Sequence, residues 1–211
     1  MVGILLTRMN CTFIGMNFLA HAYLSFENPQ IVVGNIISDY VKGASKNSFK
    51  KDIRQGITLH RRIDEYTDNH ISVKLAKEIF RPDYRLYSGA IIDVLFDHFL
   101  AKQIENEEKG SLNRLATTTY SILEDYESDL PASFISAKTH MVKHNWLGNY
   151  LYFHGIEQSL RGLSMRALYM NNSSRAFELF QIHYNELEKN FQNFFPDVKQ
   201  FAKQTLVQLL H

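Results

Sequence analysis

The sequence predicts an all-α protein, and three observations support that prediction. Apolar residues recur at three- and four-residue spacing through most of the 211-residue chain, the period of a helix with one buried face. No stretch alternates apolar and polar residues, and no Asn-Gly or Asp-Gly pair is present to close a hairpin. Each of the four prolines precedes a helix-like apolar pattern, where the first turn tolerates proline. We expect about eight to ten helices in one compact multi-helix domain.

The first clear helix is expected from Pro29 to about residue 42. Asn28 provides an N-cap, Pro29 occupies the first helical position, and Gly43 follows the last apolar residue as a stop signal. The apolar stripe of this helix consists of Ile31, Val32, Ile36, Ile37, Tyr40 and Val41.

The remaining helices follow from the same pattern. We expect them over residues 50–66 and 71–80, from Pro82 through Leu100, from Ser111 through Leu123, after Pro131, and over 177–187 and 198–209. An aromatic cluster lies between the helix expected after Pro131 and the helix expected over 177–187. It consists of Trp146, Tyr150, Tyr152 and Phe153.

Composition excludes several classes of protein. The formal net charge of +1 gives no global field that would favour nucleic acid or a membrane surface. The single cysteine, Cys11, excludes an internal disulfide framework, and no apolar run reaches the ~20 residues that span a bilayer. Residues 1–15 do not fit a signal peptide, so we interpret them as an N-terminal extension from an upstream start, with Met16 as the expected start of the domain over 16–211. We expect a cytoplasmic protein.

The segment from Gly56 to Asp68 has the strongest chemical pattern in the chain. His60, Asp64 and Asp68 are each four residues apart, so a helix brings them onto one face. Arg61 and Arg62 adjoin this column. An imidazole, two carboxylates and neighbouring guanidinium groups are typical of a site that binds a divalent metal and handles a phosphate.

Other segments add residues of the same types. Asp93 and Asp97 are four apart within the apolar stretch 90–100, where an unpaired buried carboxylate is costly, and His98 adjoins them. Asp39 lies in a similar apolar setting, on the same helix face as Asn35, and His21 closes the segment that begins at Asn17. Together they point to one shared polar site.

Each residue also has a simpler interpretation. His21 alone fits a core histidine bonded to a backbone carbonyl. Asp64 and Asp68 fit a solvated face paired with Arg61 or Arg62, and Asp39 or Asp93 fits a buried salt bridge. We favour the joint site because perturbed ionisable groups cluster at functional sites, although structural ion-pair networks produce the same pattern.

The residue types restrict the metal and the nucleophile. No cysteine cluster is present, which argues against structural zinc. Mixed imidazole and carboxylate ligation suits Mn²⁺, Fe²⁺ or Mg²⁺, with Zn²⁺ left open. The chain has no Walker loop, no Gly-x-Gly-x-x-Gly and no Gly-x-Ser-x-Gly, so we expect the nucleophile to be a metal-activated water.

These segments, in this order, resemble the acyl carrier protein phosphodiesterase family. The resemblance is strong over residues 16–102 and weak from there to the end, through Asn149-Tyr150-Leu151. The segments that carry it are Asn17-Phe18-Leu19-Ala20-His21, Gly34-Asn35 with Asp39 and Lys42-Gly43, Gly56-Ile57 with Leu59-His60-Arg61 and Ile63-Asp64, Thr67-Asp68, and Asp93 with Asp97-His98-Phe99.

The resemblance implies a fold distantly similar to the HD-type metal phosphohydrolases. It also implies hydrolysis of the phosphodiester that joins 4′-phosphopantetheine to a serine of holo acyl carrier protein, with Mn²⁺ as the expected metal and a connection to fatty acid biosynthesis. One departure is that Asp97-His98 reverses the His-Asp order of the HD-type enzymes, so their ligand geometry cannot be copied.

This chemistry suggests a role for each candidate residue. Metal ligation is expected from Asp39, His60 and Asp93, with His21 or Asp97 as further ligands. Asp64 or His98 would orient the water or act as general acid or base. Arg61 would clamp a non-bridging phosphate oxygen, because guanidinium matches phosphate geometry.

The expected partner is holo acyl carrier protein, and carrier proteins are acidic as a class. Between Lys42 and Arg62, seven basic residues face one acidic residue, so Lys50, Lys51 and Arg54 are candidates for docking, with a solvated basic face as the alternative. Two other functions stay open: hydrolysis of a nucleotide or other small phosphodiester, and carrier binding without cleavage. Neither nucleic acid nor a membrane is an expected partner, and oligomeric state is not predicted.

Overall fold

The computed structural model describes residues 17–167, 170 and 172–211, so the predicted extension and the start at Met16 lie outside it. Across these residues the regular elements are eleven α-helices and four 3₁₀ helices, with no strand, which confirms the all-α prediction. The α-helices are α1 (Phe18–Tyr23), α2 (Pro29–Ile37), α3 (Lys51–Asn69), α4 (Ile71–Tyr84), α5 (Ser88–Glu107), α6 (Ser111–Asp125), α7 (Ala132–Lys143), α8 (Trp146–Asn149), α9 (Phe153–Arg166), α10 (Ser173–Ile182) and α11 (Tyr184–Leu210). The 3₁₀ helices are η1 (Ser38–Tyr40), η2 (Gly43–Ser48), η3 (Arg85–Tyr87) and η4 (Glu127–Asp129).

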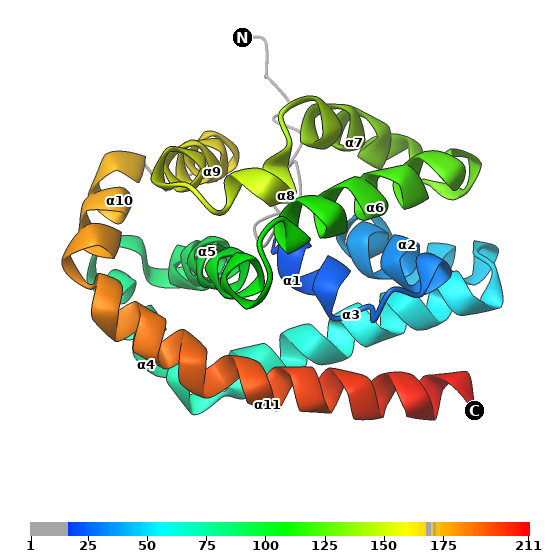
Figure 1. Ribbon diagram of the computed structural model, residues 1–211, viewed down its shortest axis with the longest axis horizontal. Helices are drawn as coiled ribbons and strands as arrows, with labels where there is room; N and C mark the ends of the chain where they lie inside the picture. Colours follow the sequence, from blue (N-terminus) through cyan, green and yellow to red (C-terminus); the bar gives the residue numbers. More distant parts are fainter. Residues whose placement is uncertain (1–16, 168–169, 171) are drawn as a thin grey trace, which may run out of the picture.

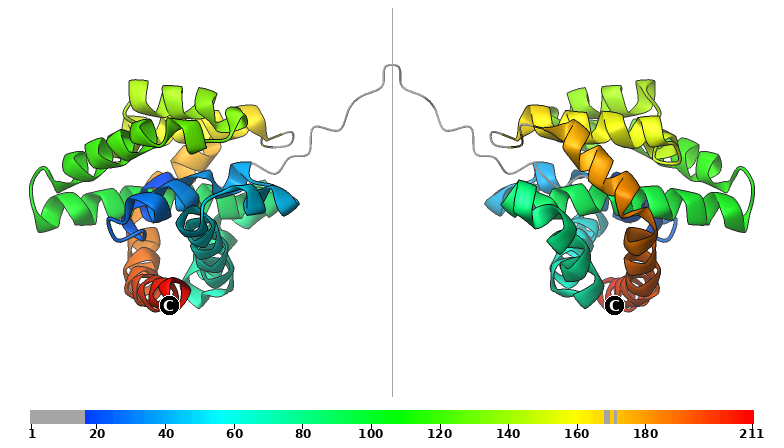
Figure 2. Two further views of the ribbon diagram at one scale, coloured as in Figure 1. Left: turned by 90° about the vertical axis from the view of Figure 1, so that its right-hand side faces the viewer. Right: turned by 90° about the vertical axis from the view of Figure 1, so that its left-hand side faces the viewer.

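The helices form tiers around a central α5 (Figures 1 and 2). Helices α6, α7, α8 and α9 lie above it in the view of Figure 1, while α3, α4 and α11 lie below. Helix α5 packs against α1, α4, α6, α9 and α11, which explains why its sequence is apolar on nearly every side. The core is continuous from α1 to α11.

Two glycines bring α2 and α3 into direct backbone contact. A Cβ atom on Gly34 would lie 2.0 Å from the Ile53 carbonyl oxygen, and one on Gly56 would lie 2.5 Å from the Ile31 carbonyl oxygen. No larger residue fits at either position without separating the helices. This close packing carries Asn35 and the residues of η1 up to the face of α3 that holds His60.

Three helix boundaries differ from the sequence prediction. Pro82 does not open a helix; it lies in the last turn of α4, which ends two residues later, before α5 begins at Ser88. Pro196 lies inside α11 rather than before a separate last helix. Proline was interpreted in both places as a start signal, but long helices with extensive apolar packing can absorb the loss of one backbone hydrogen bond. The first predicted helix also ends earlier, at Ile37, and continues as η1.

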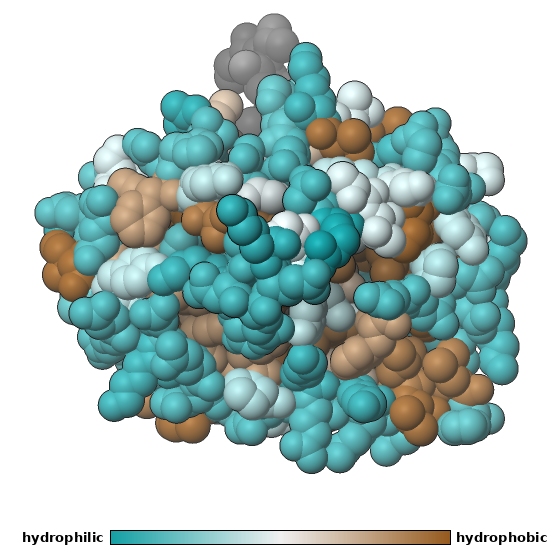
Figure 3. Space-filling view, in the orientation of Figure 1, coloured by the Kyte–Doolittle hydropathy of each residue, from teal (hydrophilic) through white to brown (hydrophobic). Residues whose placement is uncertain are grey.

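The face shown in Figure 3 is mostly hydrophilic, with small groups of apolar side chains between the polar ones. Among the described helices, none combines the length and the apolar character that a membrane crossing requires.

Candidate metal centre

Two buried histidines from different helices are stacked at the centre of the site. The ring centroids of His21 (α1) and His60 (α3) lie 3.9 Å apart. The His21 Nδ1–H donates to Asn35 Oδ1 at 2.6 Å, and the His60 Nδ1–H donates to the Asn35 backbone carbonyl at 2.7 Å. The Asn35 amide nitrogen donates to the His21 carbonyl and to Ser25 Oγ, which fixes the direction of its oxygen. A single residue of α2 therefore orients both rings.

The two Nε2 atoms point to a shared group of carboxylates. His60 Nε2 lies 3.0 Å from Asp64 Oδ2 and 3.2 Å from Asp39 Oδ1, and His21 Nε2 lies 3.2 Å from Asp64 Oδ1. His21 Nε2 is buried and makes no well-oriented hydrogen bond. One ligand atom from each of His21, His60 and Asp64 lies within 4.8 Å of the others, an arrangement that could hold a metal ion.

The electrostatics of this cluster favour a positive charge at its centre. Burial lowers the pKa of His60, but hydrogen bonds to Asp39 and Asp64 outweigh it and raise that pKa to about 10. Burial raises the pKa of Asp64, yet the adjacent imidazoles of His21 and His60 hold it well below its ordinary value. Burial, reinforced by the charge of His60, lowers the pKa of His21. A proton on His60 thus occupies the place that a divalent cation would take.

A small acidic cavity adjoins the histidines. Its volume is ≈ 160 Å³, and its lining residues are Asn17, Asp39, Asp64, Thr67, Asp68 and Asp93. Burial and then the charge of Asp64 raise the pKa of Asp93 to about 8, because carboxylates crowd around one small volume. A divalent cation here would relieve that repulsion. Together with the unsatisfied His21 Nε2, this donor set fits the mixed imidazole and carboxylate coordination expected from the sequence.

The structure brings most of the predicted site residues together. His21, Asp39, His60 and Asp64 are in direct contact, and Asp93 lines the cavity beside them. Asp68 also lines the cavity and pairs with Lys77 at 2.7 Å. Asp64 was expected to orient water, but it lies closest to both imidazoles.

Three other predicted residues do not line this cavity. The fully buried carboxylate of Asp97 accepts the backbone N–H groups of Leu19 at 3.0 Å and Ala20 at 2.9 Å. It shares a face of α5 with Asp93, but it lies one turn farther along, under the start of α1. It serves the N-terminus of α1, the helix that carries His21.

His98 and Arg61 point elsewhere. His98 lies round α5 from Asp97, where its Nδ1–H donates to the Tyr150 carbonyl and its Nε2 lies 3.0 Å from the Tyr184 hydroxyl. Arg61 is exposed and donates from Nη2 to the Val41 carbonyl at 3.1 Å. Neighbouring positions on a helix differ by about 100°, so adjacency to Asp97 or His60 in sequence did not place these side chains at the same site.

A wide basic cleft beside the cavity was missed in the sequence. The cleft has a volume of ≈ 670 Å³, shares Asp68 and Asp93 with the acidic cavity, and contains Lys77, Arg81 and Arg85. A signal for it was present, because these three cations are spaced four residues apart like His60, Asp64 and Asp68. Asn35 was noted as part of a motif, but its role in orienting both histidines depends on a contact between helices.

Comparison with known proteins gives consistent matches. A family model described as acyl carrier protein phosphodiesterase matches residues 16–198. Proteins named acyl carrier protein phosphodiesterase from Enterobacter sp. (strain 638), Pectobacterium atrosepticum and Yersinia pestis are each 31% identical over 89% of this chain and 98% of their own length. No solved structure matches the chain.

Proposed function

The chain belongs to the acyl carrier protein phosphodiesterase family, and we propose that it hydrolyses the phosphodiester joining 4′-phosphopantetheine to a serine of holo acyl carrier protein. The products are apo carrier protein and free 4′-phosphopantetheine. The observation that supports this most directly is the convergence of the His21 and His60 Nε2 atoms on Asp64 and Asp39, at the edge of an acidic cavity.

The donor set supports four residues as ligands of a divalent metal. His21 and His60 would bind through Nε2, and Asp64 and Asp39 through carboxylate oxygens. When bound, the metal lowers the pKa of a coordinated water and neutralises charge that develops on the phosphoryl oxygens. We favour Mn²⁺, with Mg²⁺, Fe²⁺ and Zn²⁺ as alternatives that share these ligand types.

Asp93 is the best placed group to handle a proton. Sequence reasoning made it a ligand, but it lies outside the tight group of His21, His60 and Asp64. It lines the cavity, and a cation bound there would offset the crowding of carboxylates that raises its pKa, which would leave Asp93 ionised and able to accept a proton. Its oxygen would take a proton from the attacking water and return it to the departing serine oxygen.

The basic cleft provides cationic groups that would attract the anionic carrier protein to the acidic cavity. Lys77 is occupied by Asp68, and Arg81 lies 3.3 Å from Glu78 in an exposed ion pair of little strength. Arg81 and Arg85 therefore have donors for acidic groups of the carrier protein around its modified serine. The candidate docking residues from the sequence lie at the N-terminal end of α3, whereas the cleft adjoins its C-terminal end. They are Lys50, Lys51 and Arg54, and Lys50 already pairs with Asp129 at 2.9 Å.

We predict that the double variant Arg81→Glu/Arg85→Glu raises the KM for holo carrier protein about tenfold at low salt, with a smaller rise for Lys50→Glu/Lys51→Glu/Arg54→Glu. The matched control reverses three exposed lysines elsewhere on the surface, Lys109, Lys143 and Lys189. Steady-state kinetics at two salt concentrations measure the effect, which salt should weaken. Equal KM values for all three variants would rule out docking at either surface.

A substrate panel tests the function itself. Turnover of holo carrier protein should exceed turnover of cyclic dinucleotides, nucleoside phosphodiesters and bis(p-nitrophenyl) phosphate when each is compared by kcat/KM. A nucleotide as the best substrate would replace the proposal with a small-molecule phosphohydrolase. Tight carrier binding without any turnover would identify a binding module.

A further inference from the structure

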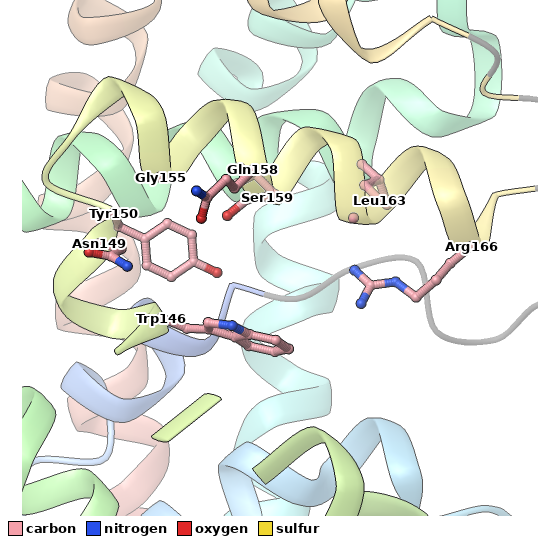
Figure 4. Close-up of a pocket in the computed structure, with 10 residues that line it drawn as sticks. Trp146, Asn149, Tyr150, Gly155, Gln158, Ser159, Leu163 and Arg166 are labelled. Atoms are coloured by element: carbon pink, nitrogen blue, oxygen red, sulfur yellow. The ribbon is translucent and has the colours of Figure 1, made fainter. Parts of the chain in front are cut away.

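Another pocket, distinct from the acidic cavity and the basic cleft, lies between α8 and α9. It has a volume of ≈ 110 Å³ and opens beside the helix turn that carries Trp146 (Figure 4). Side chains from both helices line it, among them Trp146, Asn149, Tyr150, Gln158, Ser159 and Arg166. One apolar ring, several neutral polar groups and a single cation thus share one pocket.

Two of these polar groups lack a side-chain partner in the described part of the chain. Gln158 and Ser159 make no side-chain hydrogen bond there. Arg166 interacts with Tyr40 and Tyr150 but has no carboxylate within ion-pair distance among the described residues. The Arg166 guanidinium in Figure 4 points back toward the space above Trp146. Groups of this kind, gathered around a pocket, are available to a ligand with amide or hydroxyl groups and an anionic end.

The pocket adjoins the metal centre through three pairs of consecutive residues. Asn17 lines the acidic cavity, while the ring of Phe18 lies 6.2 Å from that of Trp146. Asp93 lines the cavity and Val94 lines the pocket.

The third pair involves Arg166. Asp39 lines the cavity, and burial raises the pKa of the next residue, Tyr40, against the opposing charge of Arg166. Arg166 is therefore at the end of the pocket that is close to the carboxylates.

We propose that this pocket binds the pantetheine arm of the substrate, a deepening that rests on the proposed function. Gln158, Ser159 and the side-chain oxygen of Asn149 match the two amides and the hydroxyl of pantetheine, and Trp146 matches its gem-dimethyl group. The Asn149 side-chain nitrogen already donates to the His144 carbonyl at 2.7 Å. Arg166 contacts the phosphate at the end that faces the metal centre.

The length of the pocket agrees with this assignment. Helix α9 covers about 16 Å between Gly155 and Arg166, both of which line the pocket. The extended pantetheine arm is comparable to four or five residues of extended chain, or roughly 14 to 18 Å. A ligand that stretched along α9 would place its thiol end near Asn149.

Gly162 allows the pocket to be filled without damage to the helix. It lines the pocket, and a Cβ atom there would meet nothing within 4 Å. Gly162→Leu and Arg166→Gln are the test variants. Arg161→Gln is the matched control, because Arg161 is an exposed arginine of the same helix that does not line the pocket.

Two measurements decide the proposal. Calorimetry with the full-length protein and pantetheine alone should show binding to the wild type and to Arg161→Gln, but at least about tenfold weaker binding to Gly162→Leu. In kinetics, Gly162→Leu should lose at least about tenfold more kcat/KM on holo carrier protein than on bis(p-nitrophenyl) phosphate, which has no arm. Arg166→Gln should lose kcat/KM on both substrates, because both carry the phosphate that Arg166 contacts.

The proposal is overturned if pantetheine does not bind the wild type, or if Gly162→Leu binds it equally well. It is also overturned if Gly162→Leu loses equal activity on both substrates. A wild type that binds pantetheine in this pocket but never cleaves holo carrier protein would refute the proposed function and retain the arm site, so the two failures are distinguishable.

Discussion

Asp64→Asn is expected to reduce kcat/KM for holo acyl carrier protein about a thousandfold while the protein stays folded. Asp64 is the carboxylate that both imidazoles share, at 3.0 Å from His60 Nε2 and 3.2 Å from His21 Nε2. Loss of one negative ligand costs several kcal/mol of the charge stabilisation that a divalent metal provides, and each 1.36 kcal/mol is about tenfold in rate. The substituted amide has nearly the same shape, and the side chain is about half exposed, so packing hardly changes.

The measurement is steady-state turnover at saturating Mn²⁺, with thermal unfolding to confirm the fold. Glu65→Gln is the control, because it neutralises the adjacent, exposed carboxylate on α3 and should leave turnover unchanged. Retention of more than about a tenth of wild-type kcat/KM by Asp64→Asn would remove Asp64 from the site. His60→Ala should show a loss of similar size.

Asp97→Ala is expected to lower the free energy of unfolding by about 3 kcal/mol. The carboxylate is fully buried and accepts two backbone N–H groups at the start of α1, from Leu19 and Ala20. Alanine would leave both donors without a partner and open a small void between α5 and α1. Because burial itself raises the pKa of Asp97 well above its usual value, part of the loss is offset by the removal of a poorly solvated charge.

Urea unfolding measures this loss, with the exposed Asp125→Ala on α6 as control. Asp97→Asn should fall between the wild type and Asp97→Ala, since its side-chain oxygen still accepts one of the two N–H groups. If Asp97→Ala were as stable as the wild type but bound Mn²⁺ far more weakly, Asp97 would be a ligand, as the sequence first suggested.

Local periodicity accounts for the parts of the site that the sequence predicted well. The four-residue spacing of His60 and Asp64 places both on one face of α3, as expected. The resemblance drawn from the same segments agrees with the family to which the chain belongs. A likeness to HD-type phosphohydrolases stays a prediction.

Contacts between helices account for what the sequence did not predict. The stack of His21 on His60 depends on Asn35, which reaches both rings because Gly34 and Gly56 let α2 and α3 touch. Spacing along a single helix has no information on that contact. The same reasoning explains the position of Asp97. Its spacing of four residues from Asp93 predicts that both side chains share a face of α5, but it does not predict which of them contacts α1.

The most direct test of the central claim is the mass of holo acyl carrier protein after incubation with the wild-type protein and Mn²⁺. The proposed metal centre of His21, His60, Asp39 and Asp64 predicts conversion to the apo form, with loss of one 4′-phosphopantetheine group, and no conversion when a chelator is added. A carrier protein that keeps its full mass in the presence of Mn²⁺, or that loses the group equally fast with the chelator, would contradict it.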